Sequence, residues 1–165
     1  MKSKRDKITY LTYASMIAAL YFILTWMSEL LGLAYLTPQI RLGEALCILA
    51  WFTPAAVPGL FVGCIISNLT MGCVVWDVIF GSLATLIGAY FGSKMKRKWL
   101  VPLPTVLSNS VVVPFIIIYC YMDSVSPEIY TVTAVGVLVG EILSAYVIGL
   151  VLLYAIDKRN IFRKK

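Results

Sequence analysis

The amino-acid sequence predicts an all-α integral membrane protein, in which one bundle of six transmembrane helices has both termini in the cytoplasm. Hydrophobic residues make up 61% of the chain and charged residues 13%, whereas soluble domains are closer to half apolar and a quarter charged. Thirteen of the fourteen Lys and Arg residues stand in three short clusters, at 2–7, 94–98 and 158–165. Because basic residues tend to stay on the cytoplasmic side of a membrane, all three clusters are expected there.

A single membrane domain, residues 1–165, is expected, since each crossing takes about 20 residues. Residues 53–59 contain two prolines and a glycine, and they divide the apolar stretch that follows the first span. If the N-terminus and the 94–98 cluster share a side, residues 31–73 must hold an even number of crossings. We therefore predict two short, tilted crossings in this stretch. The predicted spans are about 8–29, 41–52, 57–69, 74–93, 99–121 and 130–156.

Two polar residues are expected deep in this bundle. Glu141 lies in the sixth span at a depth of roughly 15 Å, close to mid-membrane, and Asn109 lies at a similar depth in the fifth span. An ionisable group at this depth is costly and usually faces the bundle interior or a water-filled cavity. We predict a polar cavity between these spans that opens outward. The alternative is that Glu141 and Asn109 only hydrogen-bond to each other or to the backbone.

Further residues are predicted near the outer mouth of this cavity, where they would complete a substrate-binding site. They are Arg41, Glu44, Asn68, Trp76 and Asp77. Arg41 and Glu44 stand three residues apart, so a simple ion pair at a helix end fits the pattern equally well. Trp76 can stack on a flat ligand, but Trp is also a common anchor at the membrane interface. Tyr21 is assigned, with most other tyrosines, to that interfacial belt.

The sequence contains none of the usual signatures of an enzyme. No Walker A loop, GxSxG or HExxH motif is present, so no catalytic residue is predicted and ATP hydrolysis by the chain itself is not expected. There is no histidine, and the four cysteines form no CxxC pair, so neither a metal site nor a cofactor is predicted. The net charge of +6 comes from the basic clusters and indicates contact with the lipid bilayer rather than with nucleic acid.

Several motifs, in order along nearly the whole chain, resemble the QueT family. They are residues 38–46, 52–60, 77–86 and 102–109 and the pair Gly140 and Glu141. The resemblance implies a multi-pass plasma-membrane protein, the substrate-binding S component of an energy-coupling factor (ECF) importer. A membrane partner, the T component, and two cytoplasmic ATPase subunits would drive uptake. In such S components a small-residue motif on the first helix docks the T component. Ala14 and Ala18 fit this motif, although such pairs also pack helices within one bundle.

The family name implies a queuosine precursor as the substrate, either queuine or an aminomethyl-deazaguanine base. A deazaguanine edge carries an N–H beside an amino group, and a carboxylate such as Glu141 or Glu44 can accept both in a bidentate way. We expect Asn109 to read the neighbouring carbonyl, Trp76 or a tyrosine to stack on the ring, and Asp77 to meet a cationic aminomethyl group. Residues 32–40, between the first two spans, are the candidate lid.

Three alternatives to this reading stay open. The first is an S component for cobalamin or another vitamin, which would need a wide, open pocket. The second is a self-sufficient, proton-coupled secondary transporter with Glu141 as the proton carrier, but the chain shows no internal repeat and a lone carboxylate makes a poor relay. The third is a structural or assembly role in the membrane, against which the paired Asn109 and Glu141 argue.

Overall fold

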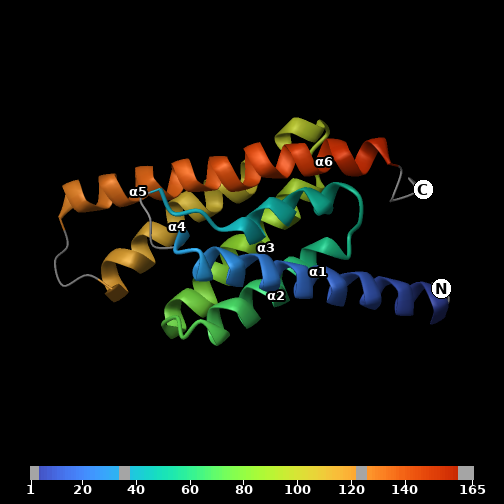
Figure 1. Cartoon of the computed structure of the whole chain (residues 1–165), viewed down its shortest axis with the longest axis horizontal. Helices are drawn as coiled ribbons and strands as arrows, with labels where there is room; N and C mark the ends of the chain where they lie inside the picture. The colour runs from blue at the N-terminus through green and yellow to red at the C-terminus, as the bar shows by residue number, and fades with distance from the viewer. Residues whose placement is uncertain (1–3, 34–37, 122–125, 160–165) are drawn as a thin grey trace.

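A computed structural model of the chain describes residues 4–33, 38–121 and 126–159, which form a bundle of helices (Figure 1). In chain order the elements are α1 (Lys4–Leu30), the 3-10 helix η2 (Leu42–Trp51), α2 (Ala56–Thr70), the π-helix η3 (Asp77–Gly81), α3 (Ser82–Ser93), the 3-10 turn η4 (Lys98–Leu100), α4 (Leu103–Tyr121), α5 (Pro127–Glu141), the π-helix η5 (Ile142–Ile148) and α6 (Gly149–Lys158).

The described helices include three that are long and apolar enough to cross a membrane. They cover residues 4–30, 98–120 and 127–158, and the last of these joins α5, η5 and α6 in one run. Shorter apolar helices cover residues 42–51, 56–70 and 77–93. The helices thus lie in the regions where spans are expected, with the break between η2 and α2 in the proline-containing stretch. That each of the six crosses the membrane stays a prediction.

The segment after Arg41 forms a 3-10 helix instead of the α-helix expected for a span. A 3-10 helix rises about 2.0 Å per residue, so the ten residues of η2 extend over about 20 Å, compared with about 15 Å for an α-helix. The Ser28 hydroxyl of α1 accepts a hydrogen bond from the Leu42 N–H at 2.8 Å and fixes the start of η2. Tertiary packing accounts for the unusual length, since residues 43–50 are all buried.

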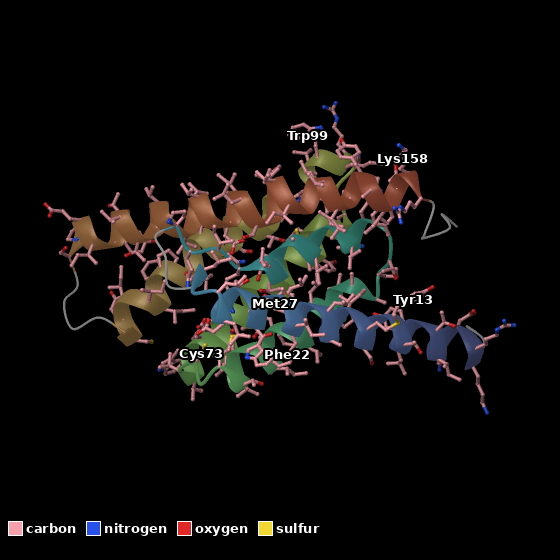
Figure 2. All side chains as sticks on the ribbon, viewed as in Figure 1. Tyr13, Phe22, Met27, Cys73, Trp99 and Lys158 are labelled. Carbon is pink, nitrogen blue, oxygen red and sulfur yellow. The ribbon has the colours of Figure 1, made fainter. Side chains whose placement is uncertain are left out.

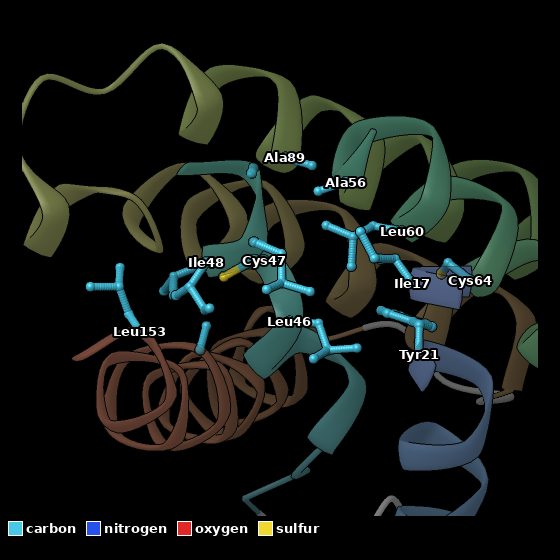
Figure 3. Packing of buried hydrophobic residues seen from close by; sticks show 14 residues of the cluster. Ile17, Tyr21, Leu46, Cys47, Ile48, Ala56, Leu60, Cys64, Ala89 and Leu153 are labelled. Atoms are coloured by element: carbon cyan, nitrogen blue, oxygen red, sulfur yellow. The ribbon is translucent and has the colours of Figure 1, made fainter. Parts of the chain in front are cut away.

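The helix η2 lies at the centre of the hydrophobic core. It contacts α1, α2, α3, η5 and α6. Figure 3 shows Leu46, Cys47 and Ile48 of η2 between side chains of α1 and α2, such as Leu60, and Leu153 of α6. Because neighbours cover η2 so completely, its sequence has no polar face, and Glu44 is its one charged residue.

Small residues allow α1 and α2 to pack closely. A Cβ atom at Gly59 would lie 2.7 Å from the carbonyl oxygen of Ala14, and one at Gly63 would lie 2.9 Å from that of Ala18. Both distances are shorter than ordinary van der Waals contact, so these positions favour glycine. The structure therefore places Ala14 and Ala18 of α1 against α2 of the same chain. The docking of a T component at these residues stays a prediction.

Apart from Arg41, the described basic residues belong to the terminal and 94–98 clusters, which gather at one end of the bundle. The start of α1 and the end of α6 lie at the same end of the molecule (Figure 1). Lys98 forms an ion pair with Asp157 of α6, and Trp99 and Lys158 lie near each other at this end in Figure 2. A one-sided distribution of this kind is typical of a cytoplasmic face. The cytoplasmic location of both termini stays a prediction.

Candidate substrate-binding site

Each of the six apolar helical segments contributes a buried polar side chain to one cluster. These side chains are Tyr21 of α1, Glu44 of η2, Asn68 of α2, Thr85 of α3, Asn109 of α4 and Glu141 of α5, and each is at most 5% exposed. A polar group in an apolar bundle is costly, and such groups usually mark a path or site for a polar solute. The convergence of six segments on one point therefore makes this cluster the candidate site.

Glu44 connects three of the helices in this cluster. Its Oε1 atom accepts a hydrogen bond from the Tyr21 hydroxyl and lies 3.4 Å from the Thr85 hydroxyl. The Thr85 hydroxyl also lies 3.6 Å from the Cys64 sulfur, which in turn lies 3.8 Å from the Asn68 amide. The sequence predicts that Glu44 lies near the outer mouth of the cavity. The structure instead buries it among α1, α2 and α3, because these helices pack around the start of η2.

Arg41 joins the cluster through Asn68. Its Nη2 atom donates to Oδ1 of Asn68 at 2.7 Å, and the Asn68 amide donates to the backbone oxygen of Asp77 at 3.2 Å. The ion pair between Arg41 and Glu44, which the sequence leaves as an alternative, is not formed among the described residues. Arg41, Asn68 and Asp77 are thus brought together as predicted, but by an amide bridge.

Glu141 and Asn109 form the other half of the cluster. The Asn109 amide donates to Oε1 of Glu141 at 3.0 Å, which is the direct bond that sequence analysis leaves as an alternative. The Gln39 carbonyl lies against Gly140, one residue before Glu141, and η2 packs against η5. The segments that carry Glu44 and Glu141 therefore lie side by side, so both halves belong to one site.

Four acceptor atoms in this site are buried and have no hydrogen-bond partner. They are Oε2 of Glu44, Oε2 of Glu141, Oδ1 of Asn109 and Oδ1 of Asp77. A buried polar group left without a partner costs about 1–3 kcal/mol, and most such groups in folded proteins are paired. The cluster thus favours a ligand that brings several hydrogen-bond donors.

The segment before Arg41 lies directly on the helix that carries Glu141. A Cβ atom at Gly140 would collide with the carbonyl oxygen of Gln39, so only glycine lets these two backbones approach this closely. Of the candidate lid at 32–40, residues 34–37 lie outside the described residues. The described part of this segment rests on α5 one residue before Glu141.

Trp76 lies apart from the cluster. Its side chain is 57% exposed, and its ring stacks on Phe80, with the two ring centroids 5.8 Å apart. Both side chains are exposed, at the start of the apolar segment that covers residues 77–93, and this position suits contact with lipid. The structure therefore does not bring Trp76 to the ligand-reading atoms.

Tyr21 is the main site residue that the sequence does not predict, because its position assigns it to the interfacial belt. The structure corrects this assignment, since the Tyr21 side chain is fully buried and bonded to Glu44. A signal does exist in the sequence. Tyr21, Thr25 and Ser28 are spaced at i, i+4 and i+7, which places three polar groups on one face of an otherwise apolar helix, and all three are buried. Thr85 carries no comparable signal.

Metal binding finds no support among the described residues, where no group of three or more His, Cys, Asp or Glu side chains could hold an ion. The chemistry that this cluster offers is hydrogen bonding and charge. Carboxylates and amides enclosed by apolar helices, three of which are long enough to cross a membrane, are typical of helical membrane proteins.

Comparison with known proteins gives the family. The model of the QueT transporter family matches residues 11–158, so the chain belongs to this family. Membership of a transporter family agrees with the three described helices that are long and apolar enough to cross a membrane. A relative from Lactococcus lactis subsp. cremoris, the queuosine precursor transporter QueT, is 36% identical over 84 residues, which are 51% of this chain and 49% of the relative. The match thus spans about half the length of that relative. No solved structure matches the chain.

Proposed function

We propose that this chain is the S component of an ECF importer in the plasma membrane and that it binds a queuosine precursor from outside. Queuine and aminomethyl-deazaguanine are the candidate ligands. The observation that carries the proposal is the buried cluster of Glu44, Asn109 and Glu141, with one unpartnered acceptor atom on each side chain. Family membership and the printed name of the relative support the ligand class.

The chemistry of a deazaguanine suits these atoms. The ring offers an N–H and an adjacent amino group, and hydrogen bonds from such donors to an ionised carboxylate are about twice as strong as those between neutral groups. Asn109 already donates its amide hydrogen to Glu141, so its free atom is the oxygen. We therefore assign Asn109 an acceptor role toward the ligand amino group, in place of the carbonyl-reading role expected from the sequence.

Ligand entry requires a movement, because the free acceptor atoms are enclosed. The contact between Gln39 and Gly140 is the closest backbone approach beside Glu141. We propose that the segment bearing Gln39 separates from α5 to admit the ligand and then closes over it. Delivery into the cell would follow on a T component and two ATPase subunits.

Isothermal calorimetry on the purified chain in detergent tests the ligand class directly. Queuine, aminomethyl-deazaguanine, guanine and cobalamin are titrated side by side. We expect tight binding of one deazaguanine, weaker binding of guanine and no heat from cobalamin. Binding of cobalamin alone would contradict the proposal. Glu128→Gln, at an exposed residue of α5, is the matched control and should bind like the unchanged protein.

A second candidate is a proton-coupled transporter that works alone. It is favoured by one observation, the interaction between two buried carboxylates, Glu44 and Glu141, which are groups able to exchange protons. Uptake into vesicles separates the two candidates. An S component should accumulate ligand only with a T component, ATPases and ATP, whereas a secondary transporter should do so alone and lose the gradient when an uncoupler is added.

A further inference from the structure

Glu44 and Glu141 share the same half-filled arrangement of hydrogen bonds. Oε1 of Glu44 accepts from the Tyr21 hydroxyl, and Oε1 of Glu141 accepts from the Asn109 amide. Oε2 of each carboxylate has no partner. The two side chains are only 2% and 5% exposed, so water does not reach these atoms freely. Each carboxylate therefore keeps one oxygen fixed by the protein and one oxygen free.

This arrangement conflicts with bidentate recognition by Glu44 alone. A bidentate contact uses both oxygens of one carboxylate side by side. Oε1 of Glu44 already has two donors, the Tyr21 hydroxyl and the Thr85 hydroxyl at 3.4 Å, which match its two lone pairs. Breaking the contact with Tyr21 would leave a buried donor unpaired, at a cost of about 1–3 kcal/mol. Oε1 of Glu141 has one donor, the Asn109 amide, so a bidentate contact at Glu141 is the competing arrangement.

We propose that one ligand bridges the two carboxylates, donating one hydrogen bond to Oε2 of Glu44 and another to Oε2 of Glu141. This inference rests on the proposed function and deepens it, because it names the feature that the site reads: two neighbouring donors directed to two different residues. The Gln39 carbonyl lies against Gly140, and η2 packs against η5, so the segments that carry Glu44 and Glu141 lie side by side and can present both carboxylates to one ligand edge. Tyr21 and Asn109 are then positioning residues that hold the other oxygen of each carboxylate.

The test crosses two variants with two ligands. Glu44→Gln and Glu141→Gln are compared with the exposed control Glu128→Gln, each as the full chain in detergent. The ligands are aminomethyl-deazaguanine and its analogue without the ring amino group, and calorimetry gives the dissociation constants. Hydrogen bonds to a charged group predict that each site variant weakens binding of the complete ligand roughly ten- to hundredfold.

The analogue distinguishes bridging from bidentate recognition. Under bridging, loss of the amino group abolishes the effect of one site variant and leaves the effect of the other in full. If one variant has no effect on either ligand, a single carboxylate takes both donors and the bridging proposal is wrong. If the unchanged protein binds neither deazaguanine, the proposed function itself fails, and bridging fails with it. The two failures are therefore distinguishable.

A second pair of variants covers the case in which a glutamine variant does not fold. Glu44→Asp and Glu141→Asp keep the charge and withdraw the carboxylate by one methylene group. With these variants too, loss of the ligand amino group should abolish the effect of one variant and leave the effect of the other in full. Equal effects of both aspartate variants on both ligands would overturn the proposal, because neither residue would then be assigned to a particular ligand donor.

Discussion

The hydroxyl group of Tyr21 is a single link between α1 and η2, and Tyr21→Phe removes it without changing the ring. A hydrogen bond to a charged group contributes about 1.5–3 kcal/mol in proteins generally, while polar contacts between membrane helices average about 0.6 and reach about 1.7. The Thr85 hydroxyl, 3.4 Å from the same Glu44 oxygen, remains as a second donor. We therefore expect a loss of about 1 kcal/mol in the free energy of unfolding, or roughly fivefold to tenfold in the equilibrium constant.

Unfolding in mixed micelles of mild detergent and dodecyl sulfate, followed by tryptophan fluorescence, measures this loss. Tyr154→Phe makes the same chemical change on α6, where the side chain is 56% exposed, and should stay within about 0.5 kcal/mol of the unchanged protein. In a Glu44→Gln background the effect of Tyr21→Phe should shrink, because the charged acceptor is gone. Equal unfolding curves for Tyr21→Phe and Tyr154→Phe would refute the link.

Three further predictions concern packing and charge. Gly140→Ala should weaken ligand binding and cost about 1–3 kcal/mol by overpacking. Gly149→Ala is the milder comparison, because its Cβ would lie 3.2 Å from the nearest backbone oxygen. Calorimetry and unfolding compare the two variants. Equal effects of both variants would contradict the close contact at Gly140. Gly63→Val should separate α1 from α2 and lower stability by a similar amount in the same assay, and an unchanged unfolding curve would be inconsistent with this packing. Lys98→Gln should change stability by under about 1 kcal/mol, since its ion pair with Asp157 is partly exposed; a larger loss would show that this pair holds the basic end together.

Composition and charge clustering predict much of the fold because the membrane restricts what a chain can do. Apolar stretches between basic clusters form helices, and the expected break lies at residues 52–55, after η2 ends and before α2 begins. The type of the second helix could not be predicted. Its 3-10 geometry follows from the neighbours that enclose it and from the Ser28 cap on Leu42, and both are tertiary contacts.

The depth of a residue along its own segment does not determine its burial. Glu44 stands near the start of its segment, so its position in the sequence suggests a mouth. Its side chain is buried because α1, α2 and α3 pack around η2, and side chains of α1 and α3 contact the Glu44 carboxylate. Glu141 was predicted more accurately, since it lies far from either end of a long apolar run. Small-residue spacing indicated close packing at Ala14 and Ala18, but spacing alone does not identify the neighbour.

The three acids of this region stand where the helices depart from regular α geometry. Glu44 lies in the 3-10 helix η2, Asp77 begins the π-helix η3, and Glu141 directly precedes the π-helix η5. In a regular α-helix, inserting one residue rotates all the side chains after it by about 100° around the helix axis. A π segment accommodates such an inserted residue in a wider turn, so that the helix continues without a break. The π segment η5 thus lets one continuous run direct Glu141 into the cluster and still bury Leu153 in the core around η2. The irregular segments thus lie beside the acids of the candidate site. Short π segments occur frequently at functional sites, which agrees with the proposed role of these acids.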